Sequence, residues 1–283
     1  MIYLLVTIYL CSAWNISALP GLFSLMHAVF FGCGAYLSSI LWIYFNISPW
    51  LGMIVGAFAA LLLALGIGWC CFRVALPILS FAIFTLIVST IVVFTLHSFP
   101  IGGSTEGLLL VYSGTHPLYF QFESKITFYY IILAMVVGIL LLARYIITTK
   151  MGTYFFAIHD NERVAAACGV NELIAFSISA VLTAFAGTFW AQYYRFVGPA
   201  SVEPHETIIV ILLTVVGGIG TLWGPVVGPV ILIPLGEILR VHLIALPGLH
   251  LIIYGVVVVV ILLGLRQGLV HWFTQWRKRR INT

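Results

Sequence analysis

The sequence predicts an all-α protein that crosses a membrane as a bundle of about eight or nine helices. Of its 283 residues, 63% are hydrophobic and only 7% are charged, and the mean hydropathy is +1.17. Apolar runs of about 20 residues, the length at which a helix spans the hydrocarbon core, recur along the chain. The alternating segments of about ten residues that are typical of membrane β-barrels do not occur. We therefore expect a single transmembrane domain over residues 1–283.

Five apolar stretches in the first half each predict one membrane-spanning helix. Breaking residues separate them: Pro20-Gly21 ends the first, and Pro77 opens the fourth, because proline is tolerated in the first turn of a helix. The expected spans are Ile2–Ala18, Leu25–Phe45, Leu51–Phe72, Pro77–Leu96 and Ile126–Ile147.

The second half is harder to divide. Ala175–Phe196 predicts a sixth span and Leu249–Leu265 the last one. Between them, Thr207–Leu239 is apolar but is interrupted by clusters of glycine and proline, so it is either one broken span or two short ones that meet at a turn.

The positions of the basic residues help to decide between eight and nine membrane spans. Arg73, Arg144 and Lys150 should face the cytoplasm, as should the basic tail over residues 271–283. The tail then lies on the same side as the polar stretch before the sixth span, which requires an even number of crossings between them. We therefore prefer nine spans, with Thr207–Leu239 counted as two and the N-terminus outside.

A polar segment over residues 148–174 separates the two apolar halves. Its centre has the pattern of a short amphipathic helix, and it holds Asp160, Glu162 and Arg163 close together. Such a helix between two spans is suited to dock into something outside the bilayer. The alternative is a solvated loop that only reverses the chain.

Two glycine-rich interruptions are candidates for a substrate path. One lies in the long connection Ser98–Lys125, which we expect to be partly re-entrant or interfacial, and the other lies within Thr207–Leu239. Broken helices leave backbone groups free to bind a substrate, and their amino ends favour a carboxylate. The path residues that we expect in them are Gly102, Gly103, Ser104, Gly217, Gly218 and Gly220.

Ionisable residues at membrane depth are few. We expect His27 to be a packing histidine, with a place in the substrate path as the alternative. Glu203 and Glu206 are expected in a solvated outer loop rather than against substrate, and Glu237 is expected to pair with Arg240 at the interface.

Motifs for catalysis are missing from the sequence. It contains no GxxxxGK[ST] phosphate-binding loop, no HExxH, no GxSxG and no CxxC pair, and its eight histidines show no metal-ligand spacing. We therefore expect no enzyme activity, no cofactor and no metal. The net charge of +4 comes largely from the tail, so it reports orientation rather than binding to nucleic acid.

Four stretches, in order, resemble the LivM-type permeases of branched-chain amino-acid ABC transporters. They are GLFSLMHAVFFGCGAY (residues 21–36), GGSTEGL (102–108), AIHDNE with AAACGVN (157–162 and 165–171) and VVGGIGTLWGP (215–225). Each alone is weak evidence, but together they run through most of the chain. The resemblance adds Ser24 to the expected substrate path.

The resemblance implies an importer subunit in a bacterial-type plasma (inner) membrane. Its partners would be two ABC ATPase subunits, a second permease subunit and an external substrate-binding protein, with membrane lipid around it. The polar segment would then be a coupling helix on the ATPase, through Ala157, His159, Asp160, Glu162, Arg163, Ala165, Ala166 and Gly169. Alternating access would follow from ATP-driven movement of this helix.

Two alternatives stay open. Urea and short-amide permeases of the same family have similar motifs. A protein of another class, either a stand-alone channel or an intramembrane transferase, would use the polar segment only as a loop. A shared fold does not fix the substrate, because specificity depends on the residues of the site.

Overall fold

Helices account for nearly all the regular structure, as the hydropathy predicts. The computed structural model describes residues 1–74, 76–111, 114, 117–160, 172–243, 248–264 and 268–271. The helices are α1 (Ile2–Ala18), α2 (His27–Phe45), α3 (Pro49–Arg73), α4 (Ile78–Ser98), α5 (Lys125–Thr148), α6 (Lys150–Asp160), α8 (Glu172–Tyr194), α9 (Pro204–Gly217), α10 (Gly224–His242) and α11 (Leu249–Gly264). Three 3-10 turns and two short strands connect them: η1 (Pro100–Gly102), η2 (Pro117–Tyr119), η3 (Pro199–Val202), β1 (Leu108–Leu109) and β2 (Phe196–Val197).

The all-α membrane fold is confirmed. Within the described part of the chain, six helices (α2, α3, α4, α5, α8 and α10) are long and apolar enough to cross a membrane. Three shorter apolar helices, α1, α9 and α11, accompany them. The total number of crossings stays a prediction.

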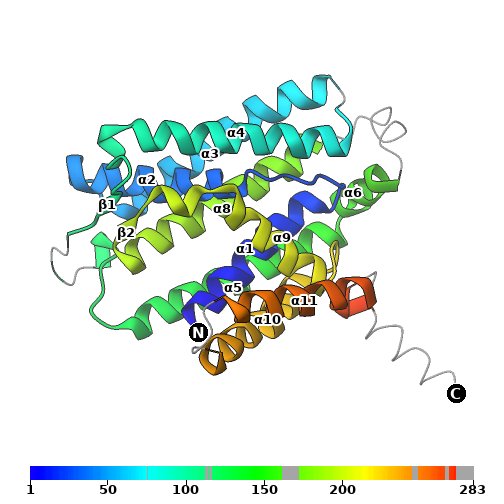
Figure 1. Ribbon diagram of the computed structural model, residues 1–283. Coiled ribbons are helices and arrows are strands. Elements are labelled where there is room, and N and C mark those ends of the chain that lie inside the picture. The colour runs from blue at the N-terminus through cyan, green and yellow to red at the C-terminus, as the bar shows by residue number, and fades with distance from the viewer. Residues whose placement is uncertain are drawn as a thin grey trace, which may run out of the picture.

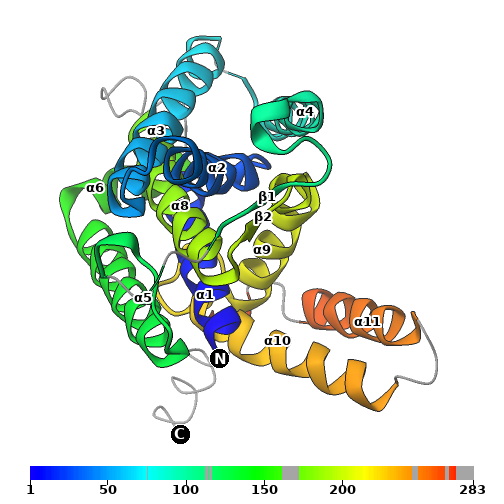
Figure 2. The same ribbon diagram turned by 90° about the vertical axis from the view of Figure 1, so that its left-hand side faces the viewer.

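Helix α1 lies at the centre of the bundle. Figure 2 shows α5, α8, α9 and α10 around it, and α1 contacts each of them. Its side chains are buried from Val6 to Ala18, except for the half-buried Leu10. A helix that is apolar on all sides is suited to such a position.

Helices α2, α3 and α8 form the tightest layer, and small residues make it possible. A Cβ atom at Gly34 of α2 would lie 1.8 Å from the carbonyl oxygen of Ala184, and one at Gly187 of α8 would lie 1.9 Å from that of Phe31. At the same residue of α2, a Cβ atom at Gly56 of α3 would lie 2.8 Å from the Gly34 Cα atom. Backbones that approach this closely supply the van der Waals contact that holds helices together in lipid.

Non-helical residues interrupt two of the apolar stretches. The expected break within Thr207–Leu239 is confirmed, because α9 ends at Gly217 and α10 begins at Gly224. The second expected span begins later than predicted: residues 22–26 are not helical, and α2 starts at His27. This non-helical segment is held by side chains, since Trp14 Nε1 donates to the Ser24 carbonyl and the Leu25 amide donates to Thr85 Oγ1.

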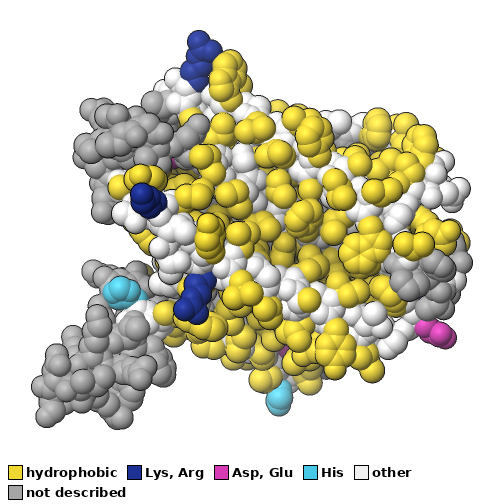
Figure 3. Space-filling view, turned by 180° about the vertical axis from the view of Figure 1, so that it is seen from behind, with side chains coloured by type: hydrophobic (Ala, Val, Ile, Leu, Met, Phe, Trp, Pro, Cys, Tyr) yellow, Lys and Arg dark blue, Asp and Glu magenta, His cyan; other side chains and the backbone are white. Residues whose placement is uncertain are grey.

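The two ends of the bundle differ. Figure 1 places β1 and β2 at one end and α6 at the other. β1 pairs antiparallel with β2, with Leu108 opposite Val197, so the long connection after α4 is anchored at its end of the bundle. On the face seen in Figure 3, hydrophobic side chains cover the middle of the bundle. The Lys and Arg side chains gather toward the α6 end, away from β1 and β2. This distribution agrees with the expected orientation, in which the α6 end is cytoplasmic.

Candidate functional site

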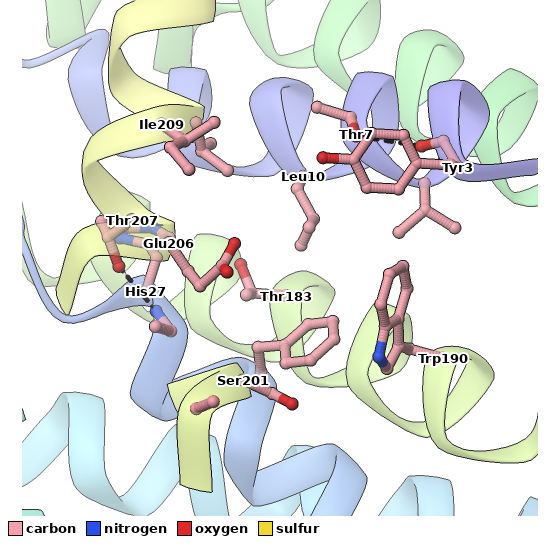
Figure 4. A pocket seen from close by; sticks show the side chains of 15 residues that line it. Tyr3, Thr7, Leu10, His27, Thr183, Trp190, Ser201, Glu206, Thr207 and Ile209 are labelled. Carbon is pink, nitrogen blue, oxygen red and sulfur yellow. Dashed lines mark hydrogen bonds between the residues drawn. The ribbon is translucent and has the colours of Figure 1, made fainter. Parts of the chain in front are cut away.

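A cavity of about 350 Å³ lies between α1, α2, α8, η3 and α9. Its volume is at the lower end of the range of small-molecule sites, about 300–1,000 Å³. Figure 4 shows its labelled side chains projecting from these different elements. Described residues that line it are Tyr3, Val6, Thr7, Leu10, His27, Ala28, Phe31, Thr183, Trp190, Ala200, Ser201, Glu206, Thr207, Ile209 and Val210.

Two helices begin at this cavity. The amide of Ala28, in the first turn of α2, donates to Thr207 Oγ1 in the first turn of α9 at 2.9 Å, so the two amino ends are joined directly. α2 follows the non-helical residues 22–26 and α9 follows η3, so each α-helix begins after a break in α-helical structure, as occurs within membrane proteins. The amino end of a helix carries a partial positive charge, and two such ends therefore meet at the wall of this cavity.

His27 both packs in the core and lines the cavity. Its ring contacts Phe30 and Phe176 edge-on, as expected for a packing histidine. Nε2 lies 2.5 Å from Ser179 Oγ, and this hydroxyl donates its single proton to the Ala13 carbonyl at 2.7 Å. Nε2 must therefore carry the proton of the neutral ring and donate it to Ser179. Nδ1 is left as an acceptor that has no hydrogen-bond partner among the described residues.

The prediction of a solvated outer loop at Glu203 and Glu206 is wrong for Glu206 in one respect, since Glu206 lies in a helix; its side chain is 49% exposed, as a solvated position requires. α9 begins at Pro204, so Glu206 lies in its first turn and lines the cavity. Figure 4 shows its side chain extending from α9 into the cavity. His205 lies between the two carboxylates, with Nδ1 3.0 Å from Glu203 Oε2 and Nε2 3.2 Å from Glu206 Oε1. Proline after Glu203 was the available signal, because proline is favoured at the first position of a helix.

The other expected path residues do not line this cavity. Gly102 lies in η1 near Tyr36, and Gly103 and Ser104 follow it with positive φ angles of 75° and 48°. Gly217 packs against the backbone of Gly224 and Gly228. Ser24 is buried before α2. Their place in a substrate path stays a prediction.

Asn15 fixes the turn between α9 and α10, a role that sequence reasoning missed. Its Oδ1 accepts from the Gly220 amide at 2.9 Å and its Nδ2 donates to the Thr221 carbonyl at 3.0 Å. Gly220 has a φ of 72° and Gly218 one of 124°, conformations that favour glycine. The asparagine in an expected membrane span was the signal, because polar groups in a membrane interior usually have a partner.

We expect Asn15→Leu to lower the free energy of unfolding by about 1–3 kcal/mol, because it removes both hydrogen bonds and leaves a partly buried amide unpaired. Asn15→Asp keeps the acceptor for the Gly220 amide and loses only the donor. Thermal unfolding in detergent measures both variants. Equal melting temperatures for Asn15→Leu and the unchanged protein would contradict the assigned role.

Helix α6 confirms the beginning of the expected amphipathic segment. It follows α5 directly, and a Cβ atom at Gly152 would lie 2.5 Å from the Ile147 carbonyl oxygen, so the tight corner favours glycine. Phe155 and Ile158 are buried, whereas Ala157 is exposed. His159 and Asp160 belong to this helix. The remaining expected coupling residues, Glu162, Arg163, Ala165, Ala166 and Gly169, lie outside the described residues.

The ion pair that was expected at the interface is present. Arg240 Nη2 lies 2.7 Å from Glu237 Oε2, and both side chains are more than half exposed. Both residues lie on α10, which ends with His242. This pair lies outside the cavity lining and provides a useful control for charge substitutions elsewhere.

Comparison with known proteins places the chain in a transport family. Residues 1–262 match the family described as the permease component of branched-chain amino acid transport systems. The chain is 26% identical over 255 residues to the high-affinity branched-chain amino acid transport system permease protein LivM of Escherichia coli K12, covering 78% of this chain and 58% of that protein. It is 28% identical over 123 residues to the protein of the same name in Salmonella typhimurium LT2, covering 42% and 29%. The chain thus matches less than two thirds of the length of either relative, and no solved structure matches it.

Proposed function

Because this chain belongs to the family of branched-chain amino acid transport permease components, we propose that it is the membrane-spanning subunit of an ATP-driven importer of branched-chain amino acids. It is a multi-pass protein of the inner membrane. The single observation that carries the proposal beyond family membership is the cavity at the joined amino ends of α2 and α9. Interrupted helices that meet at a small-molecule cavity are typical of transporters.

The transport cycle is proposed to begin at the polar segment. ATP-driven closure of two partner ATPases would push α6 and the residues after it. α5 and α8, which flank this segment in the chain, would then tilt. Movement of α8 would change the wall of the cavity, because Thr183 and Trp190 belong to it. An external binding protein would deliver the amino acid, and a second permease subunit would complete the membrane domain.

A urea or short-amide permease is the second candidate. The cavity wall favours the amino acid, because Val6, Leu10, Phe31 and Val210 present apolar surface to any bound molecule. An aliphatic side chain gains free energy by covering such surface, whereas urea has no apolar part with which to do so.

The partners can be tested by mild-detergent purification of the tagged protein from its native membrane, followed by mass spectrometry. We expect an ATPase with a phosphate-binding loop and a second permease to co-purify. Recovery of the protein alone, under conditions that keep other membrane complexes of the same cell intact, would contradict the importer and favour a stand-alone channel or transferase.

A further inference from the structure

An apolar groove runs along α8, between α3 and α5. A cavity of about 400 Å³ forms one part of it and is lined by aliphatic residues of α3 and α5, among them Leu65, and by α8 from Leu173 to Leu182. A second cavity, of about 250 Å³, shares Leu142 and Leu182 with the first and continues along α8 to Phe185. Figure 2 shows α3 and α5 on different sides of α8.

The groove has the length and width of one lipid acyl chain. Leu173 and Phe185 are twelve residues apart on one helix, which at 1.5 Å per residue is about 18 Å. The hydrocarbon of one membrane leaflet is about 15 Å thick, half of the bilayer core. A helix with its side chains is about 10 Å or more across and needs roughly 1,400 Å³ over this length, far more than either cavity holds. The groove is therefore suited to an acyl chain rather than to a helix of another subunit.

One polar group is buried in this groove without a partner. The Ser177 side chain lines the larger cavity and is 7% exposed, and its hydroxyl makes no hydrogen bond to another described residue. A buried hydroxyl without a partner is costly. Ser177 lies only four residues after Leu173, about 6 Å along α8, and so near the end of the membrane span. The acyl chains of a phospholipid begin with ester carbonyls at this depth, and such a carbonyl can accept the hydrogen bond.

A cation stands at the same end of the groove. On α3, a row of residues four apart runs from Leu65 through Trp69 to Arg73, the last residue of the helix. Gly68 packs beside Leu173, so this end of α3 lies beside the start of α8. The Arg73 guanidinium carbon is 5.1 Å from the ring centre of Trp69, and no described carboxylate pairs with it. Tryptophan favours the membrane interface, and basic groups between membrane helices on the cytoplasmic side bind anionic head groups.

From the groove, the unpaired hydroxyl and the arginine, we infer that the protein binds one anionic phospholipid of the cytoplasmic leaflet between α3 and α5. One acyl chain fills the groove, Ser177 donates to its ester carbonyl, and Arg73 binds the phosphate. Binding of this lipid does not require the transport function proposed above. It does bear on movement, because α5 and α8 lead into and out of the polar segment over residues 148–174, and a chain wedged beside them favours one spacing of these helices.

The first test measures lipid binding by the tagged full chain, in the complex with which it co-purifies, after removal of lipid in detergent. Native mass spectrometry gives the affinities for palmitoyl-oleoyl phosphatidylglycerol, which is anionic, and for the phosphatidylcholine with the same chains, which is zwitterionic. At the site of highest affinity we expect a preference for phosphatidylglycerol of roughly fivefold or more, the effect of about one basic residue. Arg73→Gln should reduce this preference to within about twofold. Arg144→Gln is the matched control and should keep it, because Arg144 is an exposed arginine of α5 that lines neither cavity. An equal preference in the unchanged protein and in Arg73→Gln would overturn the inference.

Ser177→Ala separates lipid binding from a structural role. We expect it to weaken the binding of both lipids alike, by roughly threefold to tenfold, because a hydrogen bond to the ester carbonyl is lost. The melting temperature of the lipid-free protein should not fall, since the removed hydroxyl has no partner in the fold. Ser89→Ala is the matched control, because Ser89 of α4 also has a buried hydroxyl without a described partner but lies outside the groove. A lower melting temperature for Ser177→Ala with unchanged lipid affinities would refute the contact.

Photocrosslinking in native membranes identifies the occupant. A small photoreactive diazirine side chain is placed at Val181, which lines the groove, and separately at Leu141, an exposed residue of α5 outside both cavities. We expect lipid adducts at both positions, with anionic phospholipid enriched at Val181 relative to Leu141, and we expect Arg73→Gln to abolish the enrichment. Adducts of the same lipid composition at both positions, or crosslinks from Val181 only to another protein chain, would overturn the inference.

Discussion

Replacing Glu162 and Arg163 together with alanine is expected to abolish uptake while leaving the protein inserted in the membrane. These two residues lie outside the described residues, and the expectation rests on their position just after α6 and on the family resemblance of their sequence. If they contact an ATPase, truncating one partner of a buried charge pair at the interface costs about 2–5 kcal/mol. Such a loss weakens association by roughly 30-fold or more.

The chain offers a matched control for this double substitution. Glu237 and Arg240 are also one acidic and one basic residue, although three positions apart rather than adjacent, and they form an exposed ion pair on α10. Exposed ion pairs contribute little to stability, about 0–1 kcal/mol. Glu237→Ala with Arg240→Ala should therefore keep both uptake and ATPase association. Uptake and co-purified ATPase are measured for both variants, and normal uptake in the Glu162 and Arg163 variant would exclude the coupling role.

Changing Gly34 to alanine is expected to destabilise the folded bundle by at least about 3 kcal/mol, the upper end of the usual cost of inserting extra atoms into a packed core. The new Cβ atom would meet the Ala184 carbonyl oxygen at 1.8 Å, and backbone cannot rotate away as a side chain can. α2 would have to move from α8, and the hydrogen bond from Thr188 Oγ1 to the Gly34 carbonyl would break.

The same substitution at Gly138 is expected to have the opposite sign. Gly138 lies in α5, and a Cβ atom there would meet nothing within 4 Å. Alanine is favoured over glycine inside a helix by about 1 kcal/mol. Melting temperature and the monodisperse fraction in detergent measure both variants. If Gly34→Ala were as stable as Gly138→Ala, the close packing of α2 on α8 would be wrong.

Hydropathy and breaking residues predicted the helices well because they act locally. The glycines and prolines of Thr207–Leu239 indicated the separation of α9 from α10, and Pro77 indicated the start of α4. The start of α2 was predicted two residues too early. Leu25 and Met26 are apolar enough to continue a span, but hydrogen bonds from Trp14 and to Thr85 hold that segment outside the helix.

The cavity could not be predicted in the same way. Thr7 and Thr207 both line it although 200 positions separate them in the sequence, so only the packing of the bundle brings them together. His27 was noticed because a histidine in an apolar stretch is unusual. Glu206 was correctly expected to be solvated but was assigned to a loop, and its place at the cavity depends on where α9 begins and on which helices lie opposite it. Asn15 was missed for the same reason, since its partners are in a distant turn.

The importer is tested most directly by reconstituting the complex that co-purifies with this chain into liposomes and measuring accumulation of radiolabelled L-leucine against its gradient. ATP, or a non-hydrolysable analogue of it, is supplied on the α6 side together with the external binding protein on the other side. We expect accumulation with ATP and none with the analogue. Leucine that only equilibrates, at the same rate with either nucleotide, would contradict it.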